Sequence, residues 1–163
     1  MTESYLVLIM IWPGITQLCP LNSFKKPNLL FRAVRRYAKE VKSSHKAIIK
    51  KKIEAGERFS VTTDEYTSTQ NKRFSAVSLH PSVGRPMKIG MMRIKGSLPA
   101  DKAASELKKK LNEYDITENL HVVANTTDGA AVMKAMGRHF TSIHQLCHSH
   151  GIHLAGKNCL KQF

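Results

Sequence analysis

Two aspartates, Asp64 and Asp128, are the residues whose type and sequence context best fit a catalytic role. Each follows a short stretch of β character, residues 59–63 for the first and residues 120–127 for the second. Neighbouring carboxylates are good ligands for Mg²⁺, and bound metal ions can orient a nucleophile and stabilise the leaving oxygen in phosphoryl transfer. The pair therefore predicts metal-dependent chemistry on a phosphodiester. Taken singly, Asp64 also fits a turn cap, and Asp128 also fits the N-cap of a helix over residues 130–136.

The elements that would position these residues begin with an antiparallel meander. Alternating apolar residues predict a strand that ends at Asp64, and short connections link it to two further strands. A helix beginning at Pro99 then crosses over to a fourth strand, which should lie parallel to a neighbour. The remaining expected segments are strands over residues 73–80, 87–94 and 120–124, a helix over 130–136, a strand or extended segment over 142–147, and a helix over 150–160.

Basic charge is densest ahead of the first aspartate. The formal net charge is +14, and residues 25–58 hold 12 Lys and Arg against three Glu. We expect two helices here, over residues 29–41 and 46–55, with Ser43 or Ser44 near the second N-cap and Gly56 as the stop. A solvated helix face is the alternative interpretation. The cations expected to contact nucleic-acid phosphates are Arg32, Arg35, Arg36, Lys50, Lys51, Lys52, Lys108, Lys109 and Lys110.

Composition narrows the class of protein. A chain of 163 residues with 42% hydrophobic residues can bury a core and does not fit a disordered protein. Three cysteines are too few for a disulfide framework, which favours an intracellular compartment. The apolar run over residues 5–12 is too short to span a membrane, so we expect no membrane partner. Residues 1–28 are left as an unassigned apolar run and linker.

A third group of residues lies near the end of the chain. Cys147 and His150, with further histidines beside them, resemble half of a zinc site. No second Cys or His pair stands at finger-like spacing, so we do not expect bound zinc. A small zinc-binding module built on Cys147, His150 and a neighbouring histidine remains an alternative.

Together, three segments resemble motifs of hAT-family transposases and their domesticated BED zinc-finger relatives. Residues 62–68, followed by residues 71–74, are similar to the first catalytic segment of that family, and residues 126–133 are similar to the second. Residues 147–155 resemble the C-x-x-H element that follows the second aspartate. The three motifs occur in the family's order, and the resemblance covers about residues 29–163.

The resemblance implies a ribonuclease H-like α/β core that cuts and joins DNA in the nucleus. Its mixed sheet would combine a three-stranded antiparallel meander with parallel β-α units, so that the first and fourth strands are neighbours. Residues 58–163 would be this core, and residues 29–57 a basic helical lead-in. Asp64 and Asp128 would be catalytic ligands of Mg²⁺ or Mn²⁺, with the Cys147 and His150 element beside the active site.

The chain also departs from the family pattern. The family's third catalytic residue is a glutamate far downstream, whereas no acidic residue follows Asp128 here. The BED zinc finger and the C-terminal dimerisation region are also missing, so we expect a homo-oligomer only if that region is supplied. The expectation is an incomplete transposase core that binds metal weakly and is inactive alone. The alternative is a non-enzymatic, nucleic-acid-binding protein derived from a transposon.

Overall fold

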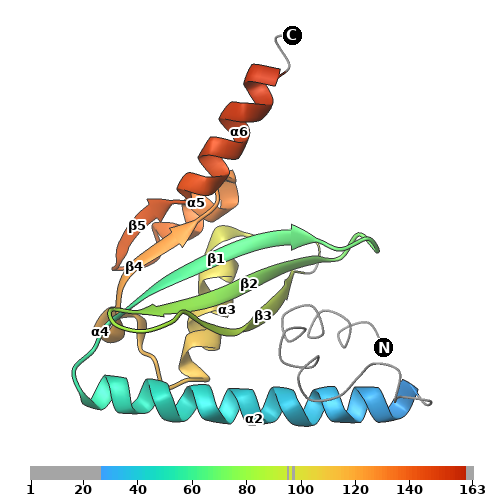
Figure 1. The fold of residues 1–163 in the computed structure, drawn as a ribbon. Helices are drawn as coiled ribbons and strands as arrows, with labels where there is room; N and C mark the ends of the chain where they lie inside the picture. The colour runs from blue at the N-terminus through green and yellow to red at the C-terminus, as the bar shows by residue number, and fades with distance from the viewer. Residues whose placement is uncertain (1–26, 95, 97, 161–163) are drawn as a thin grey trace. The chain divides into compact units, whose positions relative to one another are not determined.

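The structure of the protein, a computed structural model, describes residues 27–94, 96 and 98–160 (Figure 1). The apolar run and most of the linker expected at the N-terminus lie outside these residues. Contacts between residues divide the chain into two units, Met1–Ile48 and Ile49–Phe163. The elements are α2 (Pro27–Glu54), β1 (Phe59–Thr67), β2 (Arg73–Pro81), β3 (Met87–Ile94), α3 (Ala100–Asn112), α4 (Glu118–His121), β4 (Val122–Thr127), α5 (Ala131–Gly137), β5 (Ile143–Leu146) and α6 (His148–Leu160).

All five strands belong to the second unit and form one mixed sheet in the order β3-β2-β1-β4-β5 (Figure 1). The pairs β1–β2 and β2–β3 are antiparallel, and the pairs β1–β4 and β4–β5 are parallel. The expected α/β class is therefore confirmed, as is an antiparallel meander continued by parallel strands. The first and fourth strands are neighbours, as predicted.

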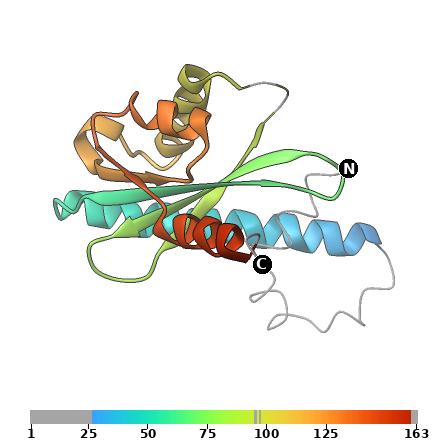
Figure 2. The ribbon, with the colours of Figure 1, turned by 90° about the horizontal axis from the view of Figure 1, so that it is seen from above.

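Helices α3 and α5 lie on the same side of the sheet and enclose the core with it (Figure 2). Helix α3 buries one apolar stripe, because Ala103, Ala104, Leu107 and Leu111 recur at helical spacing. The sheet side of this core consists of Phe59, Val61, Val77, Leu79, Met87, Ile89 and Val122. These residues alternate along their strands with more exposed ones, as the period of two requires.

Tyr114 links the segment after α3 to the edge strand β3. Its hydroxyl donates a hydrogen bond of 2.8 Å to the main-chain carbonyl of Ile89. Burial, with a smaller contribution from the nearby Glu113 carboxylate, raises the pKa of Tyr114 to about 12. The phenol therefore stays neutral and remains a donor.

The prediction of two separate N-terminal helices was wrong, because α2 is a single helix of 28 residues. Ser43 and Ser44 are exposed within it, where a serine costs only a few tenths of a kcal/mol in helix propensity, about 0.5 at most. The less exposed positions Val34, Val41 and Ile49 keep helical spacing across the serines. Continuous amphipathic spacing therefore outweighs the local capping preference of serine.

The bounds of β1 and β4 also differ from the sequence predictions. Strand β1 continues past Asp64 to Thr67, because the β1–β2 ladder extends to the Thr67–Arg73 pair. Asp64 is thus an exposed residue inside a strand and not a turn cap. A single helical turn, α4, occupies the start of the predicted fourth strand, and β4 begins two residues later than expected, at Val122.

Gly56 terminates helix α2 just beyond its last residue, Glu54, and so acts as the predicted stop. Gly56 has φ of +76°, its amide bonds to the carbonyl of Ile53 (2.9 Å), and the amide of Glu57 bonds to the carbonyl of Lys52 (2.9 Å). This pair of bonds is a Schellman motif, which requires a left-handed residue at the position of Gly56.

Glu57 then fastens the β2–β3 turn to this helix end. Its carboxylate accepts hydrogen bonds from Lys52 Nζ (2.7 Å), Ser82 Oγ (2.8 Å) and the amide of Val83 (3.2 Å). The bonds from Lys52 and Ser82 lower the pKa of Glu57 to about 2. The carboxylate consequently keeps its charge and its three partners at neutral pH.

We predict opposite effects of one substitution at two exposed glycines. Gly56→Ala should destabilise the protein by about 1–2 kcal/mol, because an L-residue is strained at positive φ although no atom lies within 4 Å of the new Cβ. Gly151→Ala, in the exposed helix α6 with similar open space, should leave stability unchanged or raise it by up to about 1 kcal/mol. Urea unfolding followed by circular dichroism measures both. Equal losses in the two variants would contradict the conformational explanation.

Candidate functional site

The parallel pairing of β1 with β4 brings the two predicted metal ligands to one end of the sheet. The register pairs Val61 with Asn125 and Thr62 with Thr126. Continued by two residues along both strands, it places Asp64 opposite Asp128. This register sets two carboxylates from distant parts of the sequence opposite each other, Asp64 within β1 and Asp128 directly after the end of β4.

Both aspartates lie on the face of the sheet that α3 and α5 do not cover. Side chains alternate along a strand, and Phe59, Val61 and Thr63 are buried on the helix-covered face. Asp64 therefore belongs to the opposite face and is exposed. The same alternation, counted from Thr126, assigns half-buried Asp128 to that face.

Asp128 is held by its own loop. Its Oδ1 accepts a hydrogen bond of 3.1 Å from the amide of Ala130, and its carbonyl accepts one of 3.1 Å from the Thr127 hydroxyl. Helix α5 begins at Ala131 with Ala130 as its N-cap residue, so Asp128 stands two residues before the cap position. The N-cap role considered for Asp128 is thus replaced by an Asx-type turn.

The C-x-x-H element lies directly beside this loop. The amide of Cys147 donates a hydrogen bond of 2.8 Å to the carbonyl of Thr127. A Cβ built on Gly129 would lie 3.8 Å from His150 Cδ2, so the histidine ring is next to the residue that follows Asp128. Among the described residues no three His, Cys, Asp or Glu side chains cluster closely enough to hold a metal ion.

An aromatic pair next to Asp64 was not singled out from the sequence. Tyr66, two residues along β1, stacks on buried Phe74 with ring centroids 5.7 Å apart and an interplanar angle of 21°. The Tyr66 hydroxyl bonds to Met91 Sδ at 3.3 Å, and burial raises the pKa of Tyr66. The signal in the sequence was the alternation along the first predicted strand and its continuation, which puts Asp64 and Tyr66 on one face.

The basic residues of α2 differ in how free their charges are. Arg32, Arg35 and Arg36 are exposed, and so are Lys50 and Lys51. Lys50 Nζ lies 4.0 Å from Glu54 Oε1, and both side chains are mostly exposed, so this pair contributes little.

Lys52 differs from these residues because its ammonium is already bound. Besides its bond to Glu57, it donates one of 2.9 Å to the carbonyl of Val83. Its side chain is half-buried, and this arrangement favours a structural role over a phosphate contact.

The lysines of α3 do not share a face with the aspartates, because α3 covers the other side of the sheet. Lys109 pairs with Glu106 and Lys110 with Glu113, at 2.7 and 2.9 Å. Both pairs join positions three residues apart on the helix. The structure therefore does not bring Lys108, Lys109 and Lys110 together with the predicted metal site.

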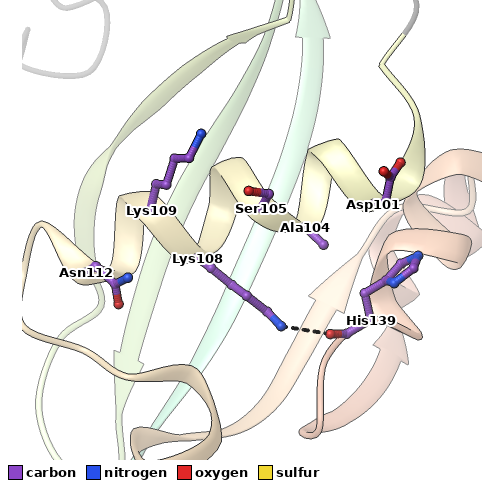
Figure 3. Close-up of a pocket in the computed structure, with 7 residues that line it drawn as sticks. All are labelled: Asp101, Ala104, Ser105, Lys108, Lys109, Asn112 and His139. Carbon is purple, nitrogen blue, oxygen red and sulfur yellow. Dashed lines mark hydrogen bonds between the residues drawn. The ribbon is translucent and has the colours of Figure 1, made fainter.

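Lys108 has structural partners at an open polar hollow of about 370 Å³ (Figure 3). Its ammonium donates a hydrogen bond of 3.0 Å to the carbonyl of His139 and lies 3.5 Å from Glu118 Oε2. It also lies 5.1 Å from the centre of the Phe140 ring. The hollow is lined by Asp101, Ala104, Ser105, Lys108, Lys109, Asn112 and His139.

The pair Asp64 and Asp128 fits part of a site for a hard divalent cation. The Asp64 carboxylate has no hydrogen bond or ion pair with another residue in the described part of the chain, and Asp128 uses only Oδ1. Two adjacent carboxylates repel each other unless a cation or a proton lies between them. Oxygen ligands of this kind suit Mg²⁺ or Mn²⁺ better than zinc.

Comparisons with known proteins add no identification. No model of a known protein family matches the chain, and no curated protein matches its sequence. A search of the described residues for a helix that is both long and apolar enough to cross a bilayer finds none.

We predict that Lys108 contributes to stability and Lys109 does not. Lys108→Ala should cost about 1–2 kcal/mol, because Glu118, only 8% exposed, would lose its counter-charge. Lys109→Ala is the matched control and should change stability by less than about 0.5 kcal/mol, since Lys109 and Glu106 are both mostly exposed. Denaturant unfolding of the two variants is the measurement. A loss at Lys109 as large as at Lys108 would contradict this assignment.

Proposed function

We propose that residues 58–163 form a ribonuclease H-like core of the hAT transposase type, which acts on DNA phosphodiesters with Mg²⁺ or Mn²⁺. The observation that carries this proposal is the parallel β1–β4 pairing within the strand order β3-β2-β1-β4-β5. Continued to Asp64 and Asp128, the register of that pairing supports a shared site on the face of the sheet that α3 and α5 do not cover. The order of the three sequence motifs supports the same assignment. A nuclear location, where DNA is accessible, belongs to the proposal.

In this proposal Asp64 and Asp128 hold the cation, and each has a distinct setting. Asp64 is exposed and belongs to a strand interior, so its position is fixed by the β1–β2 ladder, in which it pairs with Ala76. Asp128 is half-buried and is oriented by the amide of Ala130. The cation, when bound, supplies charge stabilisation to the attacking and leaving oxygens of an in-line displacement.

Two carboxylates supply only part of what such chemistry needs. The family to which the motifs are similar uses three acidic ligands, and the sequence offers none after Asp128. We propose that the 163 residues bind Mg²⁺ or Mn²⁺ weakly and join no DNA strands by themselves.

The decisive test is cation binding at the aspartate pair. Asp64→Asn and Asp128→Asn should each weaken Mn²⁺ binding about tenfold or more, because each removes a charged ligand. Asp101→Asn, at an exposed aspartate of α3, is the matched control and should bind as the unmodified protein does. Paramagnetic resonance of free Mn²⁺ measures the affinity, and nicking of supercoiled DNA gives a second measurement. If Asp64 and Asp128 variants bind and nick like the control, the metal site is not there.

A second candidate function, non-enzymatic nucleic-acid binding, rests on α2. Arg32, Arg35 and Arg36 are exposed at positions three and four apart, so they project from neighbouring positions on one helix. Their charges can replace the counterions that surround DNA phosphates, and each replaced charge makes affinity more sensitive to salt.

Salt titration tests this candidate. Replacing Arg32, Arg35 and Arg36 together by Ala should weaken DNA binding and reduce the slope of log affinity against log salt by roughly 2–3. Lys102→Ala, at an exposed lysine of α3, should leave the slope unchanged. Fluorescence anisotropy with a labelled duplex is the measurement, and an affinity that ignores salt in the unmodified protein would rule out phosphate binding.

A further inference from the structure

The hydroxyl of Thr127 links Asp128 to strand β5. Thr127 is fully buried at the end of β4, and its Oγ1 donates a hydrogen bond of 3.1 Å to the carbonyl of Asp128. The same Oγ1 lies 2.9 Å from Nε2 of His144, in the middle of β5. A hydroxyl has one proton to donate, so the proton of the second bond comes from Nε2 of the imidazole. In the tautomer of His144 that carries the proton on Nε2, His144 donates to Thr127 and Thr127 donates to Asp128.

The imidazole of His144 is seated against a glycine. Gly137 is the last residue of α5, and a Cβ at this position would overlap the His144 ring at Cγ, Cδ2 and Nε2. Gly137 does not have a positive φ, so its backbone conformation does not require glycine. Glycine is required here because the His144 ring occupies the space of a Cβ. Glycine is a poor helix former, so alanine would be favoured here if the ring were elsewhere.

The peptide before Asp128 is thus held from β5 at two points. The main chain of Thr127 accepts the bond from the Cys147 amide, and the side chain of Thr127 accepts the bond from His144. Only the bond between His144 and the Thr127 hydroxyl connects to Asp128 through a side chain. The carboxylate itself is held separately, by the amide of Ala130.

We propose that His144 is a positioning residue that acts through Thr127 to fix the orientation of the Asp128 carboxylate. Gly137 leaves the space in which the His144 ring packs. The Nε2 of His144 is engaged by Thr127 and is therefore not free to bind a metal ion. The inference deepens the proposed function, since the aligned carboxylate is the one that would hold a divalent cation. Residues that orient a metal-binding carboxylate typically change metal affinity 10–100-fold when replaced.

Four variants of the full chain test this role. His144→Leu removes the donor, whereas His144→Gln keeps one, because the amide nitrogen of Gln occupies a place similar to Nε2. Gly137→Ala fills the seat of the ring and leaves His144 itself unchanged. His153→Leu, at an exposed histidine of α6, is the matched control.

Amide hydrogen exchange reports the alignment without any metal. The Ala130 amide bonds to the Asp128 carboxylate, and the Cys147 amide reports whether β5 still pairs with β4. We expect exchange at Ala130 to become about tenfold faster in His144→Leu and Gly137→Ala, with Cys147 unchanged. His144→Gln and His153→Leu should stay within about threefold of the unmodified protein. Equal acceleration at both amides would mean that His144 merely docks β5, and an unchanged Ala130 would also overturn the proposal.

Mn²⁺ affinity gives the second measurement. It should fall about tenfold or more in His144→Leu and be restored in His144→Gln. An affinity in His144→Leu equal to that of the unmodified protein would overturn the proposal. If the unmodified protein binds no Mn²⁺ at the aspartate pair, the proposed function fails, and the exchange rates at Ala130 still decide the role of His144.

Discussion

The parallel pairing of β1 with β4 is the constraint on which the rest of the second unit depends. Parallel neighbours cannot be joined by a tight turn, so the chain must form the meander, cross over one face and return in register. Helix α3 makes this crossover stable because its stripe of Ala103, Ala104, Leu107 and Leu111 is buried against the sheet. The register that, when continued, sets Asp64 opposite Asp128 is a consequence of this topology, and no local feature of either segment would produce it.

The alternation of side chains then divides the chemistry between two faces. The face that packs against α3 receives the apolar residues, so the aspartates are left on the other. Cations on α3 are separated from them by the sheet, and Lys108 already compensates Glu118. A net charge of +14 therefore does not indicate which Lys or Arg side chains would contact a polyanion. The arginines of α2 are exposed, whereas Lys108, Lys109 and Lys110 of α3 each have an acidic partner.

Much of this arrangement could be predicted from the sequence, where strict periodicity was available. The period of two marked β1, β2 and β3, and the apolar stripe from Ala103 to Leu111 marked α3. Local signals gave a wrong helix boundary where a longer apolar pattern determined the structure. The capping preference of Ser43 and Ser44 was outweighed within a continuous amphipathic helix. The contacts between Gly137, His144 and Thr127 had no sequence signal, because three separate elements supply them and no spacing rule connects them.

The inward-facing residues of the sheet change from apolar to polar toward the end that holds the aspartates. Along β1 the buried residues run Phe59, Val61, Thr63, and the neighbouring strands change likewise from Val122 to Asn125 and from Val77 to Ser75. Thr63 Oγ1, Ser75 Oγ and Asn125 Oδ1 are buried without a hydrogen-bond partner in the described part of the chain. Each such group costs about 1–3 kcal/mol unless water reaches it. A fold selected for stability alone would place apolar residues at these positions. The cost is concentrated beneath Asp64 and Asp128, which is where a functional site is expected to depart from good packing.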